Sequence, residues 1–178
     1  MKNKQIKILG ISGSLRPDSS TAVVLKAIEK LLPENVHFTL YNGIGQLPHF
    51  DGSEIVGDEI TNWRKSLQET DGIIICTPEY AFGMPGSLKN ALDWTVYTGD
   101  FVNKPTALIT ASSQGEKGHA SLLQTLTALS ADMSNETTLL ISFIRAKLNE
   151  HGEVKDEATR IALQNLVTAF LYKLSQAA

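Results

Sequence analysis

The chain has 178 residues, of which 42% are hydrophobic and 20% charged, as expected for one ordinary globular domain spanning residues 1–178. A net charge of −3 leaves no basic stripe, so the composition argues against a nucleic-acid-binding protein. A single cysteine, Cys76, excludes an intrachain disulfide framework and favours a reduced, cytoplasmic location.

The first five residues are polar, and the apolar run that follows at 6–11 is only as long as a strand. We therefore expect no signal peptide and no membrane-spanning segment. Apolar residues at helical spacing then predict a helix from about 20 to 32, with its inner face formed by Val24, Leu25, Ile28, Leu31 and Leu32.

Strand and helix patterns continue to alternate along the middle of the chain. Residues 36–41 alternate as a second strand, and residues 43–50 form a loop. A second helix is predicted from about 54 to 70, with Ile60, Trp63 and Leu67 on one side. Residues 72–76 are apolar on both faces, which indicates a strand buried inside a parallel sheet.

The second half of the chain repeats this alternation. A third helix starts near Pro85, with Leu88, Ala91 and Leu92 facing inward, and residues 106–110 form a fourth strand. A fifth strand is predicted over 137–144 and a last helix over about 155–176. The fourth helix has a stripe of Leu122, Leu123, Leu126, Leu129 and Met133, and the last helix has Ile161, Ala162, Leu166, Ala169 and Phe170 on its core side.

Alternating strands and helices require crossover connections, so the sheet should be parallel with helices on both faces. Five strands fit the doubly wound order 2-1-3-4-5, whose switch point lies between the first and third strands. Open α/β proteins bind ligands at that point, beyond the carboxyl ends of the strands. The loops expected there are residues 12–21 and 77–85.

The loop after the first strand has the residues of a phosphate site. Hydroxyl groups and free amides at a helix start bind phosphate, and Arg16 can add a charge-assisted hydrogen bond. The alternative is that Ser19, Ser20 and Thr21 merely cap the helix. The position after a central strand, together with Gly13 and Arg16, favours phosphate binding.

The glycine spacing and the neighbouring residues exclude two common classes of phosphate-containing ligand, the dinucleotides and the nucleoside triphosphates. No third glycine follows Gly10 and Gly13, and no acidic residue ends the second strand, so the dinucleotide fingerprint is missing. The Lys-Ser/Thr pair of the nucleoside triphosphate loop is missing as well. A hydroxyl-lined pocket of this kind suits a terminal monophosphate such as that of FMN.

Three motifs in order resemble the NADPH-dependent FMN reductase family, whose members have a flavodoxin-like three-layer α/β sandwich. They are Gly13-Ser14-Leu15-Arg16 with Ser19, then Thr77-Pro78-Glu79-Tyr80 with Pro85-Gly86 and the segment 88–94, then Thr110-Ala111-Ser112-Ser113-Gln114-Gly115. The similarity covers almost the whole chain. It implies FMN as the cofactor and NADPH or NADH as the co-substrate.

The resemblance also implies a set of cofactor contacts. The FMN phosphate would be held by Ser14, Arg16, Ser19, Ser20 and Thr21, and the isoalloxazine ring would lie between Pro78, Glu79, Tyr80 and Ala81 on one side and Ser112, Ser113 and Gly115 on the other. The family usually has asparagine where Thr21 and Ala81 stand, and often serine where Gly83 stands. These departures affect flavin affinity and substrate preference more than the identity of the cofactor.

The expected activity is hydride transfer from NAD(P)H through FMN to flavin, quinone, azo or similar small acceptors. Because the cofactor performs the chemistry, we expect no catalytic side chain. Cys76 is interpreted as a buried core thiol, and His119 as either a solvated loop histidine or a residue near the flavin. The four histidines share no metal-ligand spacing with Cys76 or with a carboxylate cluster, so no metal is expected.

Apolar residues around the third helix suggest that copies of the chain associate as a homodimer or a dimer of dimers, in which family members pair through their third and fourth helices. These residues are Phe82, Met84, Trp94, Val96, Tyr97, Phe101 and Val102. Two alternative functions are a non-enzymatic flavodoxin-like electron carrier and a scaffold that has lost its FMN. Carriers meet their partners through a strongly acidic rim, which the net charge of −3 disfavours.

Overall fold

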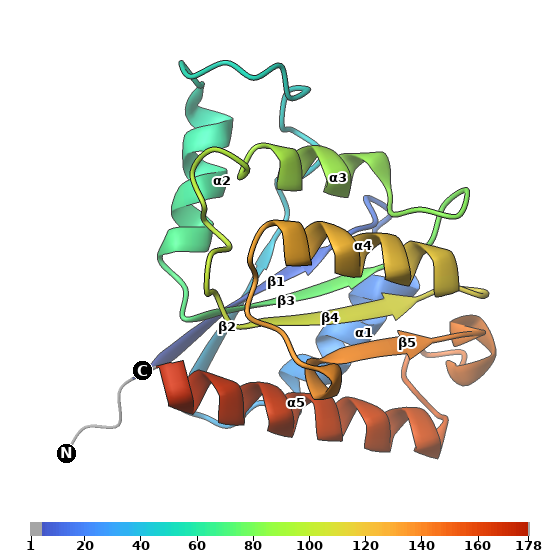
Figure 1. Cartoon of the computed structure of the whole chain (residues 1–178). Coiled ribbons are helices and arrows are strands. Elements are labelled where there is room, and N and C mark those ends of the chain that lie inside the picture. Colours follow the sequence, from blue (N-terminus) through green and yellow to red (C-terminus); the bar gives the residue numbers. More distant parts are fainter. Residues whose placement is uncertain (1–4, 178) are drawn as a thin grey trace.

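The computed structural model describes residues 5–177, and its five strands form one parallel sheet in the order β2-β1-β3-β4-β5 (Figure 1). This is the predicted flavodoxin-like α/β order, which is therefore confirmed. The strands are β1 (Ile6–Ser12), β2 (Val36–Tyr41), β3 (Gly72–Thr77), β4 (Thr106–Ala111) and β5 (Thr138–Ile141).

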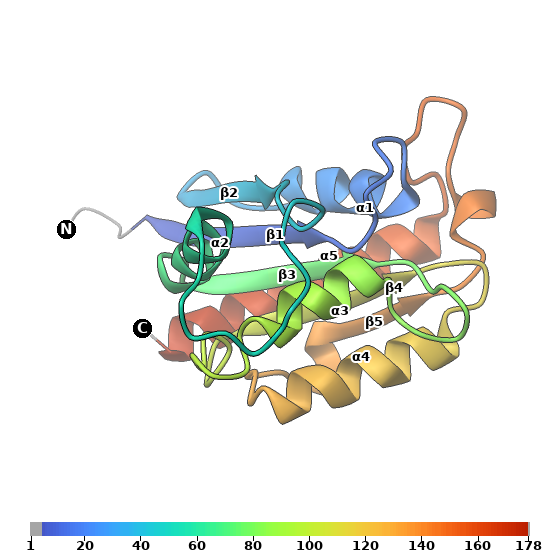
Figure 2. The ribbon, with the colours of Figure 1, turned by 90° about the horizontal axis from the view of Figure 1, so that it is seen from above.

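Helices cover both faces of the sheet, as Figures 1 and 2 show. One face is covered by α1 (Ser20–Glu29) and α5 (Glu157–Ala177), and the other by α2 (Asp58–Gln68), α3 (Gly86–Asp93) and α4 (Glu116–Ala128). Two short 3₁₀ helices, η1 (Asn135–Thr137) and η2 (Ile144–Lys147), flank β5. None of the helices within residues 5–177 combines the length and apolar character needed to cross a membrane.

Each face of the sheet has its own hydrophobic core. Ile73 and Ile75 pack under α2, α3 and α4, whereas Ile74 and Cys76 pack under α1 and α5. The strand β3 is thus buried on both faces, as its unbroken apolar run predicts. Burial raises the pKa of the Cys76 thiol far above its ordinary value, which agrees with its interpretation as a core thiol.

The boundaries of two predicted elements were wrong. The helix α2 begins at Asp58 rather than near 54, with Gly57 at its N-cap. The strand β5 has only four residues, because residue 137 ends η1 and Phe143 takes a left-handed φ of 55° that breaks the strand. The chain therefore turns at Phe143 and enters η2 instead of continuing the sheet.

Two predicted helix faces were correct in part, since Leu122 and Leu126 of α4 and Leu166 and Phe170 of α5 are buried as expected. Ile161 was expected in the core but is 52% exposed, because α5 buries a stripe that includes Leu163 and Val167. The helix α4 ends at Ala128, so Met133 lies beyond it, and Leu123 is partly exposed while Leu122 is buried. The packing of each helix against the sheet, which propensity alone does not specify, sets these faces.

Candidate functional site

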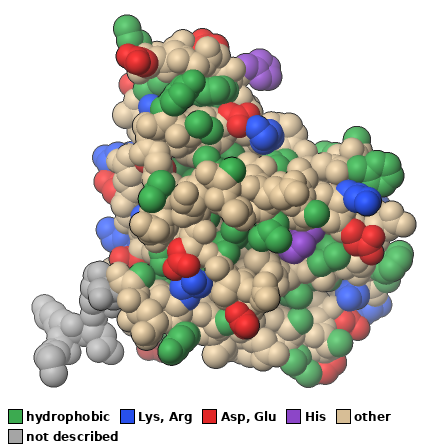
Figure 3. All heavy atoms as spheres, in the orientation of Figure 1, with side chains coloured by type: hydrophobic (Ala, Val, Ile, Leu, Met, Phe, Trp, Pro, Cys, Tyr) green, Lys and Arg blue, Asp and Glu red, His purple; other side chains and the backbone are tan. Residues whose placement is uncertain are grey.

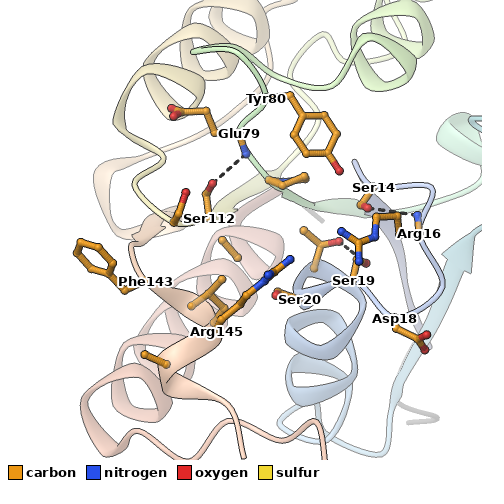
Figure 4. Close-up of a pocket in the computed structure, with 16 residues that line it drawn as sticks. Ser14, Arg16, Asp18, Ser19, Ser20, Glu79, Tyr80, Ser112, Phe143 and Arg145 are labelled. Carbon is orange, nitrogen blue, oxygen red and sulfur yellow. Dashed lines mark hydrogen bonds between the residues drawn. The ribbon is translucent and has the colours of Figure 1, made fainter.

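The register of the sheet brings four strand ends to one edge. Ser12 pairs with Cys76, Thr77 with Thr110, and Ala111 with Ile141, so four loops leave the sheet side by side. Between them lies a cleft of about 520 Å³, drawn in Figure 4. A cleft of this size and position is where open α/β proteins bind small ligands.

The loop after β1 crosses the end of β3 at very short range. The Gly13 N–H donates to the Cys76 carbonyl at 2.8 Å. A Cβ atom added to Gly13 would lie 2.3 Å from Thr77 Oγ1, which no real side chain tolerates. Glycine is therefore required where the two loops of the cleft meet.

The start of α1 is organised by hydroxyl groups. Ser19 is its N-cap, and Ser19 Oγ accepts from the Ala22 N–H at 3.2 Å. Thr21 Oγ1 lies 2.8 Å from Ser19 Oγ and 2.9 Å from Ser12 Oγ. The capping interpretation is thus correct for Ser19, and the capped helix directs the positive end of its dipole at the cleft.

The opposite wall is the loop after β3. The Glu79 N–H donates to Ser112 Oγ, at the end of the neighbouring strand β4, at 3.3 Å, and Glu79 Oε2 accepts from the Gly118 N–H at 2.6 Å. Tyr80 and Gly83 exchange two backbone hydrogen bonds of 2.9 Å, closing a tight turn. These bonds fix the loop from both sides.

The third wall is made by the ends of β4 and β5. The Phe143 N–H donates to the Ser113 carbonyl at 3.0 Å, and the Ile144 N–H donates to the Ser112 carbonyl at 3.1 Å. This arrangement places Arg145 of η2 on the cleft. Figure 4 shows its side chain extending toward Ser20 at the start of α1.

Most of the residues predicted for the site lie together on this cleft. Ala81 and Gly115 do not line it, because Ala81 lies in the turn beyond Tyr80 and Gly115 is the N-cap of α4. The predicted residues that line it are Ser14, Arg16, Ser19, Ser20, Thr21, Pro78, Glu79, Tyr80, Ser112 and Ser113.

Sequence reasoning missed one segment of the lining. Phe143, Ile144, Arg145 and Ala146 line the cleft next to the predicted residues, as do Asp18 and Ala111. The available signal was their place just after the fifth strand, whose carboxyl end lies at the same edge as the others. That signal was hidden because the strand was predicted to continue to residue 144.

His119 does not line the cleft. It is partly buried in α4, where His119 Nδ1 lies 2.9 Å from Thr110 Oγ1. Burial lowers the pKa of its imidazole, so the side chain favours the neutral form. It is therefore not the solvated loop histidine that was one of the two expectations. Within residues 5–177, no three His, Cys, Asp or Glu side chains gather in a way that could hold a metal ion.

The two ends of the cleft differ in chemistry, and together they fit an FMN molecule. Ser14, Ser20, Arg16 and Arg145 put hydroxyl and guanidinium groups around the start of α1, where a phosphate would bind. The other end is lined by residues 78–80 and 111–113, at the ends of β3 and β4, where a flat ring would lie.

Comparison with known proteins gives an independent view of the chain. The model of a family described as NADPH-dependent FMN reductase matches residues 6–145. A quinone reductase of Escherichia coli is 30% identical over 94% of this chain and 95% of its own length. An NAD(P)H-dependent FMN reductase of Pseudomonas aeruginosa is 31% identical over 92% of both chains.

A solved structure agrees with these relatives. The flavoenzyme FerB of Paracoccus denitrificans, an NAD(P)H:(acceptor) oxidoreductase, superposes with a TM-score of 0.78 at 26% identity. The match covers 96% of this chain and 98% of FerB. The shared architecture therefore extends over nearly the whole chain.

Proposed function

The chain belongs to the NADPH-dependent FMN reductase family, and from that premise we propose that the cleft at the carboxyl edge of its sheet is the FMN site. It is an oxidoreductase that depends on FMN and NAD(P)H. The observation that carries the proposal is the polarity of the cleft, which has guanidinium and hydroxyl groups around the start of α1 and the strand-end residues 78–80 and 111–113 at its other end.

In this proposal the phosphate of FMN binds at the start of α1, and the ring lies against the ends of β3 and β4, where Glu79 and Ser112 are hydrogen-bonded to each other. Ser14, Arg16 and Ser20 face the phosphate, and the residues 78–80 and 112–113 hold the ring. When bound, FMN accepts hydride from a reduced nicotinamide and passes electrons to an acceptor. The protein orients the ring and leaves the open side of the cleft for the two substrates.

No side chain of the cleft is expected to act as an acid, base or nucleophile. The Glu79 carboxylate accepts the Gly118 N–H at 2.6 Å, and Figure 4 shows its side chain directed away from Arg16 and Arg145. Cys76 is fully buried in the sheet and its thiol stays protonated. The cofactor-binding residues therefore carry out binding and orientation only.

Small quinones, azo compounds and free flavins are the acceptors that we propose, because the cleft is open to solvent and has few charged groups to select a substrate. A cytoplasmic location belongs to the same proposal, since the one thiol is reduced and NAD(P)H is available there.

One experiment tests the function directly. Recombinant full-length protein is mixed with FMN, its absorbance spectrum is recorded, NADPH is added without oxygen, and 1,4-benzoquinone follows. We expect a flavin spectrum that bleaches with NADPH and returns with the quinone over many turnovers. A bound flavin that turns over only once favours the electron carrier, and a colourless protein that leaves FMN fluorescence unquenched favours the scaffold.

We also propose that two copies of the chain associate through the face beside the cleft. Tyr80 and Phe82 of the β3–α3 loop and Val96, Tyr97 and Val102 after α3 are exposed, and Figure 3 shows hydrophobic side chains on this face of the molecule among polar ones. Phe101 and Trp94 are buried and belong to the core instead. Sedimentation at micromolar concentration should give a dimer or a dimer of dimers, and a lone monomer would rule out this association.

A further inference from the structure

The hydroxyl groups at the start of α1 are hydrogen-bonded to one another in a defined direction. Ser12 Oγ lies 3.0 Å from the Ser14 carbonyl, which can only accept, so the Ser12 hydroxyl donates there. Thr21 must then donate to Ser12 across 2.9 Å. Ser19 in turn must donate to Thr21 across 2.8 Å. The hydroxyl hydrogens of these three residues are therefore all engaged in hydrogen bonds within the protein and are not available to a ligand.

This direction leaves few donors for a phosphate. Ser14 and Ser20 keep their hydroxyl hydrogens, the first turn of α1 offers backbone amides, and Arg16 and Arg145 offer guanidinium groups. A phosphate monoester carries nearly two negative charges at neutral pH. Only the two arginines among these donors bring positive side-chain charge to the site.

Arg145 is held in place by its neighbour in the chain. Ile144 is 2% exposed, packs in the core beneath α1, and donates its N–H to the Ser112 carbonyl. Among residues 5–177, the side chain of Arg145 forms no ion pair or hydrogen bond. Figure 4 shows it directed at Ser20, from the side of the cleft opposite to Arg16.

Neither of the acidic residues that line the cleft lies beside the Arg145 guanidinium, so an anion can bind there. Glu79 is bound to Gly118, and Asp18 lies beyond Arg16, on the far side of the loop from Arg145 (Figure 4). We propose that Arg145 is a positioning residue for the flavin phosphate, which it holds together with Arg16, and that it makes the site select FMN over riboflavin. This inference rests on the proposed function.

The test compares two ligands that differ only in the phosphate. Dissociation constants of FMN and riboflavin are measured by flavin fluorescence with the full-length wild-type protein, Arg145→Gln and Arg145→Lys. Lys147→Gln is the control, because it removes the same charge from the same 3₁₀ helix at a position that does not line the cleft.

We expect Arg145→Gln to weaken FMN binding about tenfold, the effect of losing one charge-assisted hydrogen bond at an open site, and to leave riboflavin binding unchanged. Arg145→Lys should recover part of the loss, and Lys147→Gln should match the wild type. Unchanged FMN affinity in Arg145→Gln, or equal losses for both ligands, would overturn the inference while the proposed function stands. Wild-type protein that binds neither ligand would overturn both.

Discussion

The carboxylate of Glu79 and the backbone amide of Gly118 are joined by a hydrogen bond of 2.6 Å between Oε2 and N. It links the loop after β3, which lines the cleft, to the first turns of α4, which lie outside it. A Cβ on Gly118 would lie 3.0 Å from Glu79 Cβ and 3.1 Å from the Gly83 carbonyl oxygen, so the close approach depends on glycine. Glu79 is thus an anchor for its own loop.

We predict that Glu79→Ala lowers the free energy of unfolding by about 1–2 kcal/mol, because a charge-assisted hydrogen bond is lost and the Gly118 amide is left without its partner. Glu79→Gln keeps an acceptor oxygen and should cost less. Urea unfolding measures both variants, with Glu116→Gln as a control that removes a carboxylate from the exposed first turn of α4.

The same variants test the prediction that Glu79 does not act as a general acid or base in the reaction. NADPH oxidation with excess FMN and a quinone should be nearly the same for Glu79→Gln as for the wild type. A large fall in turnover with unchanged stability would mean that the carboxylate transfers a proton during the reaction, contrary to the assignment of Glu79 as an anchor.

Arg16 is the second residue for which the site makes a sharp prediction. Arg16→Ala should weaken FMN binding by about tenfold or more, because a guanidinium beside a phosphate forms charge-assisted hydrogen bonds. Lys26→Ala removes a positive charge from the last turn of α1, the helix that follows the Arg16 loop, and should leave the affinity unchanged. Equal effects of the two variants would indicate a general charge effect and not a phosphate contact.

Much of this site could be predicted from the sequence, because it depends on local patterns. The apolar run at 72–76 predicts a strand buried on both faces, and the serines after Gly13 predict that a helix begins just after the first strand. Each of these two patterns can be recognised within one short segment of the sequence. The order of the strands follows from the alternation of elements and from the handedness of their crossovers.

The contribution of β5 could not be predicted in the same way. The left-handed φ of Phe143 ends the strand early, and nothing in the residue type announces it, since phenylalanine seldom adopts that conformation. It is stabilised by hydrogen bonds from Phe143 and Ile144 to the β4–α4 loop, which is some thirty residues away in the chain. Arg145 reaches the cleft only through this tertiary contact.

The contact between Gly13 and Thr77 gives a prediction for stability. Gly13→Ala would place a Cβ 2.3 Å from Thr77 Oγ1 and 2.7 Å from Thr77 Cβ, so the two loops must separate. We expect a loss of about 2 kcal/mol in the free energy of unfolding, the usual cost of overpacking. Gly86→Ala is the matched control, because a Cβ there meets nothing within 4 Å. If both variants were equally stable, the close contact would be incorrect.

The turn between Tyr80 and Gly83 carries backbone strain that can be removed. Ala81 and Phe82 have φ angles of 48° and 61°, a conformation in which a side chain costs about 1 kcal/mol per residue and which Asn-Gly adopts easily. The double variant Ala81→Asn/Phe82→Gly should therefore raise the free energy of unfolding by about 1–2 kcal/mol. Thermal and urea unfolding measure the gain, and a less stable variant would show that the exposed Phe82 ring makes stabilising contacts.

His119 makes the stability of the fold depend on pH. Burial lowers its pKa in the folded protein below the ordinary value of about 6.5 that the unfolded chain has. Below pH 6.5 the unfolded chain binds more protons, so the free energy of unfolding falls as the pH drops toward the folded pKa. Above pH 6.5 the imidazole is neutral in both states, and its contribution is fully present and constant.

The prediction is a loss of stability between pH 6.5 and the lowered pKa that disappears in a variant without the imidazole. Urea unfolding of the wild type and of His119→Asn at several pH values from 7.5 to 5 measures the slope. His151→Asn removes an exposed imidazole near Glu150 and should keep the slope of the wild type. If the slope were the same in His119→Asn as in the wild type, other groups would cause the pH dependence. The protonation of His119, which is hydrogen-bonded to Thr110, would then have no effect on the free energy of unfolding.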